Sequence, residues 1–403
     1  MMNDVTKKDK DEFRREFKSW LSAECVRDPG FILPETFMEV GSDQQFEFLR
    51  EWQYKLWSAG YLGMGWPKEY GGGGVSTAYQ KIVDEELAAF RAPIAINAVG
   101  LNWTGPLIKD FGTEEQKLRY LKGILSAEDI WCQGFSEPDN GSDLGNVQCR
   151  AVRDGDEYVV NGSKIWTTLG NYAKYMILLA RTDPDASRKY DGLSFFLAPM
   201  TVEGIDPRPI QKLTGEYGFC ETFFTDARIP QDCLMGEEGA GWRVAMQTLQ
   251  YERGAEAGAA GGQIATVVGV DRVIDSLRSV QRDGQPILDD PVVRDQLVSF
   301  FIRWRVCNLL DIRSAIPALT SDYPSSLLLS RKLIGTEFIR ALRKFTIQCH
   351  GANGGLYVGD EGAIEGGFWQ RGYLNSFSAT IGGGTSQIQA NIVAERVLGL
   401  PKS

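Results

Sequence analysis

The stretch Cys149-Arg150-Ala151-Val152-Arg153-Asp154-Gly155, followed shortly by Tyr158-Val159-Val160, decides the fold. Two β-prone runs on either side of an Asp-Gly pair are typical of a β-hairpin with a tight turn. Asn161-Gly162 predicts a second turn directly after it. Apolar runs at residues 175–180, 193–198 and 221–224 predict further strands. We therefore expect an all-β middle region, an antiparallel barrel or sandwich.

Helical spacing of apolar residues continues on both sides of this β region. Before it, residues 11–23 and 44–59 carry helical patterns, Gly71 to Gly74 interrupt the chain, and Thr113 begins a capping box with Gln116. After it, four long helical runs, at residues 242–268, 290–313, 325–348 and 386–398, predict a four-helix bundle. The expected fold class is α+β and multidomain. Its parts are an N-terminal α-helical domain (1–128), a middle β domain (129–238) and a C-terminal helical bundle (239–403).

The composition excludes several classes of function. A net charge of -10 argues against a general attraction to nucleic acid. No apolar run reaches about 18 residues, so we expect no membrane span. The seven cysteines form no C-x-x-C pair, which argues against a disulfide framework or a zinc cluster and predicts reduced thiols in a cytoplasmic protein. His350 is the sole histidine, so we expect no metal site.

Five blocks of sequence, in this order, resemble those of acyl-CoA dehydrogenases. They are WCQGFSEPDNGSD (131–143), YVVNGSKIWTT (158–168), LMGEEGAGW (234–242), IQCHGANGG (347–355) and GTSQIQ (384–389). The resemblance extends over nearly the whole chain and agrees with the helical, β, helical order. It implies bound FAD, α,β-dehydrogenation of an acyl-CoA thioester to the trans-2-enoyl-CoA, and a homotetramer built as a dimer of dimers. It also implies that electrons pass to an electron-transferring flavoprotein.

The first two blocks supply the residues that the resemblance places at the flavin ring. They are Gln133, Phe135 and Ser136 at its edge, Gly141 and Ser142 near the cofactor and the CoA arm, and Trp166, Thr167 and Thr168 over the ring and its reactive nitrogen. A flavin becomes anionic when it is reduced, so donors at its pyrimidine edge stabilise the reduced state. The alternative is that Trp166 is a core residue and that the two threonines are ordinary strand residues.

The remaining FAD contacts implied by the resemblance lie in the C-terminal region. They are Arg282, reaching the pyrophosphate in a neighbouring subunit, Gln348, Gly351, Ala352, Thr385 and Gln387. This chain lacks the aromatic residue that is often found shortly after the arginine in the family. The alternative interpretation of Arg282 is a solvated residue in a turn. Thr385 begins the last helix, whose N-terminal N–H groups suit an anion or a polar cofactor edge. We interpret His350, inside the same region, as structural.

The resemblance implies that the catalytic base lies away from its common position in the family. Many members carry a glutamate where this chain has Gly383, which has no side chain to accept a proton but keeps a backbone N–H for the thioester oxygen. A second solution in the family aligns with Glu252, on the helix after the β region, and Glu256 is the alternative one turn later. Tyr251 is expected to line the acyl pocket, with a core position as the alternative, and Arg253 is expected to anchor either the helix or the CoA side of the substrate. Glu252 and Arg253 could instead form a local surface pair.

Three functions are compatible with these residues. The first is an acyl-CoA dehydrogenase using Glu252, on a long, branched or bulky acyl group. The second is a structural or base-less subunit of a heteromeric acyl-CoA dehydrogenase, favoured by Gly383 and opposed by Glu252. The third is a flavin oxidase or monooxygenase of the same fold. The alternatives differ in whether an acyl-CoA bleaches the flavin and whether oxygen then reacts.

Overall fold

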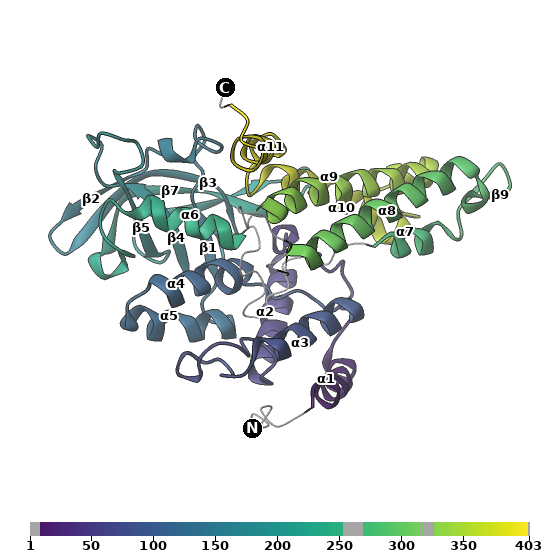
Figure 1. Cartoon of the computed structure of the whole chain (residues 1–403), viewed down its shortest axis with the longest axis horizontal. Coiled ribbons are helices and arrows are strands. Elements are labelled where there is room, and N and C mark those ends of the chain that lie inside the picture. The colour runs from purple at the N-terminus through teal and green to yellow at the C-terminus, as the bar shows by residue number, and fades with distance from the viewer. Residues whose placement is uncertain (1–8, 253–268, 315, 317–318, 320–325, 402–403) are drawn as a thin grey trace. The chain divides into compact units, whose positions relative to one another are not determined.

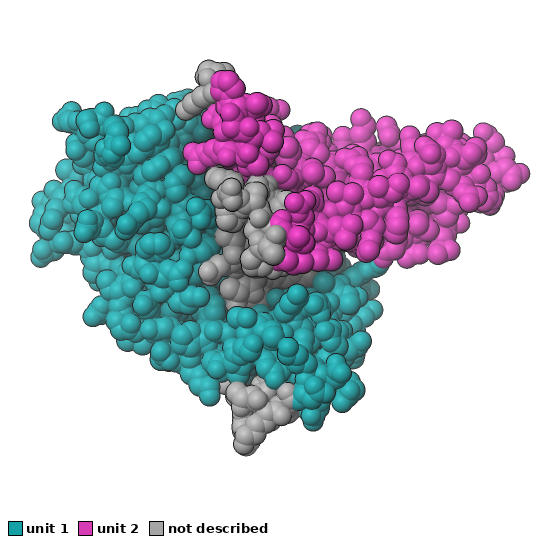
Figure 2. All heavy atoms as spheres, viewed as in Figure 1, with its two compact units in different colours: residues 1–266 teal, residues 267–403 magenta. Residues whose placement is uncertain are grey.

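The computed structural model describes residues 9–252, 269–314, 316, 319 and 326–401. The chain forms two compact units, residues 1–266 and 267–403 (Figure 2). The predicted boundaries after residues 128 and 238 stay a prediction.

The first unit begins with helices whose apolar faces pack together. They are α1 (Lys10–Glu24), α2 (Asp43–Ser58), α3 (Thr77–Phe90), α4 (Gly105–Phe111) and α5 (Glu114–Ser126). Both predicted amphipathic helices are confirmed, and α1 buries Phe13, Phe17 and Leu21. The capping box of Thr113 and Gln116 forms in both directions. A π-helical turn (Gly100–Thr104) leads into α4.

A seven-stranded sheet follows. Its strands are β1 (Trp131–Gly134), β2 (Arg150–Asp154), β3 (Glu157–Thr168), β4 (Tyr175–Arg181), β5 (Leu193–Pro199), β6 (Ile205–Gln211) and β7 (Tyr217–Pro230). The path runs β1-β4-β2-β3-β7-β6, with β5 also paired to β4. The predicted β middle is confirmed, but the sheet is mixed, because β1 and β2 pair with β4 in parallel. β4 is an unbroken apolar run because both of its faces are buried, each in a different core cluster.

The predicted hairpin of residues 149–160 is present, but its turn and the turn predicted after it both need correction. Asp154 pairs with Glu157, so the turn is Gly155-Asp156 rather than Asp154-Gly155. Gly155 has φ +63°, which a tight hairpin turn requires. The second predicted turn, at Asn161-Gly162, is wrong. β3 continues through it with a shift of register against β7, and Gly162 has φ +138°. A bulge uses the same residues as a turn, so the sequence alone does not separate them.

Helix α6 (Gly241–Glu252) completes the described part of the first unit and packs against β5 and β4 (Figure 1). It confirms the start of the helix predicted at 242–268, whose remainder lies outside the described residues.

The second unit is helical around α9. It contains α7 (Val270–Leu277), the short hairpin β8 (Gln281–Arg282) and β9 (Gln285–Pro286), α8 (Pro291–Ser314), α9 (Ser326–Cys349), α10 (Phe368–Ile381) and α11 (Ser386–Ile392). α8, α10 and α11 each pack on α9 (Figure 1). The helical bundle is confirmed, although α7 and α10 were not predicted, and the last predicted helix ends in a π-helical turn (Val393–Val397).

Candidate active site

Strand β1 and the segment after it place the first predicted flavin residues. Gln133 lies on β1, and its amide oxygen is buried without a hydrogen-bond partner among the atoms that the structure describes. Phe135 is buried against Phe195, while Ser136 is partly exposed. The carbonyl oxygen of Ser136 accepts a hydrogen bond from the N–H of Ile165 at 2.8 Å, which joins this segment to the end of β3. An uncompensated buried amide oxygen in such a place fits a site whose donor comes from a ligand.

The end of β3 presents Trp166 outward. The pairing of β3 with β7 shifts register between Lys164 and Thr167, and Trp166 lies within this bulge at φ +61°. Its side chain is 57% exposed, so the alternative interpretation of Trp166 as a core residue is wrong. A left-handed conformation is disfavoured for a bulky residue, and such strain concentrates at functional sites.

The two threonines that follow differ in their surroundings. Thr167 is fully buried, and its hydroxyl accepts a hydrogen bond from the Thr222 hydroxyl at 3.2 Å. Thr168 is partly exposed at the last position of β3. The exposed Trp166 and the partly exposed Thr168 therefore share the accessible end of the strand. The flavin contact predicted for Thr167 would have to use its backbone.

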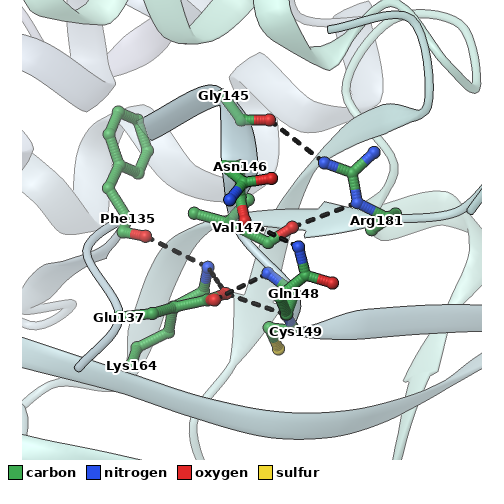
Figure 3. Close-up of polar contacts among 9 residues, drawn as sticks. All are labelled: Phe135, Glu137, Gly145, Asn146, Val147, Gln148, Cys149, Lys164 and Arg181. Atoms are coloured by element: carbon green, nitrogen blue, oxygen red, sulfur yellow. Dashed lines mark hydrogen bonds and ion pairs between the residues drawn. The ribbon is translucent and has the colours of Figure 1, made fainter. Parts of the chain in front are cut away.

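The loop between β1 and β2 is anchored by residues that sequence reasoning missed. Gly141 and Ser142 are exposed on it, and a Cβ at Gly141 would meet no atom within 4 Å. Glu137 of this loop and Lys164 of β3 form a buried ion pair of 2.8 Å, and Arg181 binds loop carbonyls (Figure 3). No local signal could have found the pair, because Glu137 and Lys164 are 27 residues apart and Lys164 follows the polar residues Asn161, Gly162 and Ser163.

Helix α6 carries the predicted base. Its buried positions Gly241, Val244, Ala245, Thr248 and Tyr251 follow helical spacing. Glu252 follows Thr248 by four residues, so it lies at the margin of this buried face and is partly buried. Tyr251 is 2% exposed, and its hydroxyl donates to the Asp110 carboxylate of α4. Tyr251 thus holds α6 in place beside Glu252. Arg253 and Glu256 lie outside the described residues.

In the second unit, the glycine run before α11 has a backbone reason. Gly383 and Gly384 have φ values of +66° and +94°, in the left-handed region that favours glycine. The Gly383 carbonyl accepts a hydrogen bond from Gln389 Nε2 at 2.8 Å. Thr385 caps α11 by accepting from the Ile388 N–H at 3.2 Å. Gln387 is exposed in the first turn. Residue 383 therefore has a conformation that a glutamate would adopt only under strain.

The other predicted FAD residues of this unit are exposed. Arg282 lies beside the turn of the β8–β9 hairpin and pairs with Asp290 at 3.3 Å. Gln348 is exposed on the last turn of α9, and Gly351 (φ +58°) and Ala352 follow it on the surface.

His350 makes a contact that suits a structural role. Its Nε2 is 3.1 Å from the Ser276 hydroxyl, and burial lowers the pKa of its imidazole. The ring thus joins the end of α9 to α7.

Other reactive groups in the described residues do not form a competing site. All seven cysteines are free thiols, and burial raises the pKa of Cys149 and of Cys220 to about 11. Thiols with such raised pKa values are poor nucleophiles at neutral pH. In the described ranges, no group of three or more His, Cys, Asp or Glu side chains is arranged to hold a metal ion. Within those same ranges, the helices are too short or too polar to cross a membrane.

Comparison with known proteins gives matches along the whole chain. The family models described as acyl-CoA dehydrogenase N-terminal, middle and C-terminal domains match residues 9–128, 132–227 and 239–398. Acyl-CoA dehydrogenase IpdE1 of Mycolicibacterium smegmatis is 38% identical over 403 residues, which cover 97% of this chain and 98% of the relative. IpdE1 of Mycobacterium tuberculosis is 36% identical, with 98% of each chain covered.

Solved structures agree. The Tcur3481-Tcur3483 steroid ACAD superposes with a TM-score of 0.81 at 32% identity, covering 98% of each chain. The ChsE4-ChsE5 complex from Mycobacterium tuberculosis gives 0.78 at 30% identity over the full length of both chains.

Proposed function

The chain belongs to the acyl-CoA dehydrogenase family, and from this premise we propose that Glu252 removes the α-proton of an acyl-CoA thioester to give the trans-2-enoyl-CoA. The family comprises oxidoreductases that act on the CH–CH group of acyl-CoA. Two observations, one in each unit, carry the proposal: Glu252 on α6 is partly buried, and residue 383 is a glycine with a left-handed backbone. A carboxylate is thus available at one of the two positions that family members use, and the other holds none.

FAD is the proposed cofactor, and the residues of the first unit fit it. The buried amide oxygen of Gln133 lacks a partner within the described part of the chain, and a ring donor would satisfy it. Trp166 offers a flat, exposed aromatic face next to that segment. When bound, the flavin supplies the acceptor for the β-hydrogen as hydride. We propose that Phe135, Ser136, Gly141, Ser142, Thr167 and Thr168 complete this part of the site. Arg282, Gln348, Gly351, Ala352, Thr385 and Gln387 would hold the remainder of FAD, including in a neighbouring subunit.

The α-proton is removed more readily when the thioester oxygen is hydrogen-bonded. The α C–H is weakly acidic, so developing charge on the carbonyl oxygen must be stabilised as the proton leaves. We assign one such donor to the backbone N–H of Gly383. Helix α6 contributes rigidity, because the hydrogen bond from Tyr251 to Asp110 and the packed face below it fix the backbone that carries Glu252. Tyr251 would therefore contribute to the substrate site by fixing the position of α6. Arg253 would lie on the CoA side.

The proposed substrate is a long, branched or bulky acyl-CoA. The relative with the TM-score of 0.81 is described as a steroid ACAD, which favours a polycyclic acyl group among these. A panel of straight, branched and ring-bearing acyl-CoAs with an artificial electron acceptor tests this directly. We expect the highest kcat/KM on ring-bearing or branched thioesters, and a preference for short straight chains would contradict the proposal.

A base-less subunit of a heteromer is the second candidate. Two of the structural matches are named as pairs of different chains, and residue 383 is glycine here. The candidates separate in a visible spectrum of the protein expressed alone. Yellow protein that an acyl-CoA bleaches supports the dehydrogenase, whereas yellow protein that stays oxidised with every thioester supports the base-less subunit. Bleaching followed by oxygen-dependent product formation would instead indicate an oxidase or monooxygenase.

We propose that the working form is a homotetramer, or a heterotetramer with a related chain, in the cytoplasm. Exposed apolar residues on α8 support an assembly. An electron-transferring flavoprotein is the proposed electron acceptor. Reoxidation of substrate-reduced protein by such a flavoprotein, followed at the two flavin spectra, tests this part.

A further inference from the structure

A fully buried ion pair joins three segments around the loop after β1. Lys164 is 0% exposed and Glu137 6% exposed, with 2.8 Å between Nζ and Oε1. Lys164 Nζ also donates to the Phe135 carbonyl at 3.1 Å. The Glu137 carboxylate accepts from the backbone N–H groups of Gln148 at 2.6 Å and Cys149 at 2.8 Å (Figure 3). One pair therefore fastens the exit of β1, the middle of β3 and the entry to β2.

A second buried cation holds the same loop from β4. Arg181 donates from Nε to the Val147 carbonyl at 3.0 Å and from Nη2 to the Gly145 carbonyl at 3.1 Å (Figure 3). Its third contact is the Lys189 carbonyl at 3.2 Å. The loop is thus fixed through its backbone, although Gly141 and Ser142 at its tip are exposed.

The position of the ion pair links it to the proposed flavin residues. Phe135 is held through its carbonyl by Lys164, and Ser136 is held through its carbonyl by Ile165, the next residue of β3. Trp166 comes directly after, in the left-handed bulge. Lys164 therefore sets the register between the segment carrying Phe135 and Ser136 and the strand end carrying Trp166.

An ion pair is a costly way to fill this space. Removing two charges from water is expensive, and apolar side chains of similar volume often stabilise a fold as well or better. What a buried pair with fixed backbone partners does supply is one defined arrangement of the segments it joins, because any shift leaves a buried charge uncompensated. Such an arrangement is useful where backbone groups must meet a ligand at fixed positions.

We propose that Lys164 and Glu137 are positioning residues for the flavin ring, acting through the backbone of Phe135 and Ser136 and through Trp166. This inference rests on the proposed function, because it needs bound FAD. Neither side chain is required to touch the reacting atoms. The pair keeps the groups at the ring edge and over the ring in register, so that the reduced, anionic flavin is stabilised.

The experiment compares three variants with the wild type. Lys164→Met leaves the carboxylate of Glu137 buried, and Glu137→Gln leaves the ammonium of Lys164 buried. The double variant removes both charges and keeps an amide oxygen for the N–H groups of the loop. The matched control is Gln53→Leu, since Gln53 is also fully buried and binds three backbone groups of the helical region at 2.9–3.1 Å. Thermal unfolding, the dissociation constant of FAD and the midpoint potential of the bound flavin are measured for each.

We expect the double variant to unfold at a temperature closer to the wild type than either single variant does. Its FAD dissociation constant should nevertheless rise at least tenfold, and its flavin potential should become more negative. Gln53→Leu should lower the unfolding temperature without changing either flavin property. If the double variant does not accumulate as folded protein, Glu137→Gln alone is judged by the same two flavin readouts.

Wild-type affinity within twofold and an unchanged potential in the double variant would overturn the inference, leaving the pair with a purely structural role. A wild type that binds no added FAD would overturn the proposed function, and the inference with it. If the wild type binds FAD and acyl-CoA bleaches its flavin, but the variants keep the wild-type FAD affinity and flavin potential, the inference is wrong and the proposed function stands.

Discussion

The carboxylate of Glu252 is the residue on which the proposed chemistry depends. Glu252→Gln keeps the size of the side chain and removes its basicity, so FAD should stay bound while the rate of flavin bleaching by acyl-CoA falls by about 10²–10⁴-fold. Stopped-flow absorbance at the flavin band measures this. Glu237→Gln, an exposed acid just before α6, is the matched control and should bleach normally. Bleaching of Glu252→Gln at the wild-type rate would exclude Glu252 as the base.

Gly383 differs from its neighbour Gly382 in backbone conformation rather than in chemistry. Gly382 has φ −62° and Gly383 has φ +66°. We expect Gly383→Ala to lower the free energy of unfolding by about 1–2 kcal/mol, because a Cβ is disfavoured in the left-handed region. Gly382→Ala should be close to neutral, since its Cβ would meet only the Ser378 carbonyl oxygen, at 3.4 Å. Equal losses in denaturant titrations would show that the conformation at 383 is not what requires glycine.

Asp84 on α3 should make stability depend on pH. Burial raises the pKa of Asp84 from 3.8 to about 7. Because this carboxyl group is harder to ionise in the folded than in the unfolded state, the free energy of unfolding falls as the pH rises from about 4 to about 7. It stays lower above pH 7. Asp84→Asn should therefore stabilise the protein by about 2 kcal/mol at pH 8, discounted for partial exposure, and by almost nothing at pH 4. Thermal unfolding at both pH values checks this, and a difference that grows toward pH 4 would contradict it.

At the scale of elements, a substitution in the bulge at Trp166 should affect FAD binding and the stability of the fold differently. Trp166→Gly removes an exposed ring and relieves a left-handed backbone, so the unfolding temperature should stay the same or rise. Affinity for FAD should fall, because the face that would cover the flavin is lost. Fluorescence titration with FAD and thermal unfolding measure the two effects. A large loss of stability would mean that Trp166 supports the fold.

The same elements show what the sequence could predict. The helices with one apolar face, such as α1 and α2, were predicted because burial follows a helical period. α10 was missed because much of its buried face is polar, including Gln370, Arg371 and Asn375. The parallel pairing of β1 with β4 and the bulge at Trp166 depend on which strands become neighbours. The ion pair of Glu137 and Lys164 joins residues far apart in sequence, so no local sequence pattern predicts it.

At the scale of the whole molecule, α8 points to an assembly. The helix is apolar on more than one side, and the side packed on α9 accounts for only part of this surface. Six of its large apolar side chains are at least half exposed: Val292 lies in the first turn, and the other five are Val298, Phe301, Ile302, Leu309 and Ile312. The spacing of these five by three, four or seven residues, apart from the adjacent pair 301 and 302, gathers them along the helix. A stripe of this kind on a folded chain is typical of a protein interface, which agrees with the proposed tetramer.

Phe301→Glu combined with Ile302→Glu places two charges in the middle of this stripe, where burial in an interface would leave them uncompensated. We expect the purified wild type to be a tetramer by light scattering and the double variant to dissociate into smaller species. Because Arg282 is proposed to reach the FAD of a neighbouring subunit, dissociation should also weaken FAD binding. Leu118→Glu, which charges an equally exposed apolar residue on α5, is the control and should change neither property. A double variant that remains tetrameric would show that α8 is not part of the interface. A wild type that is monomeric alone and forms a tetramer only with a second, related chain would favour the heteromeric form.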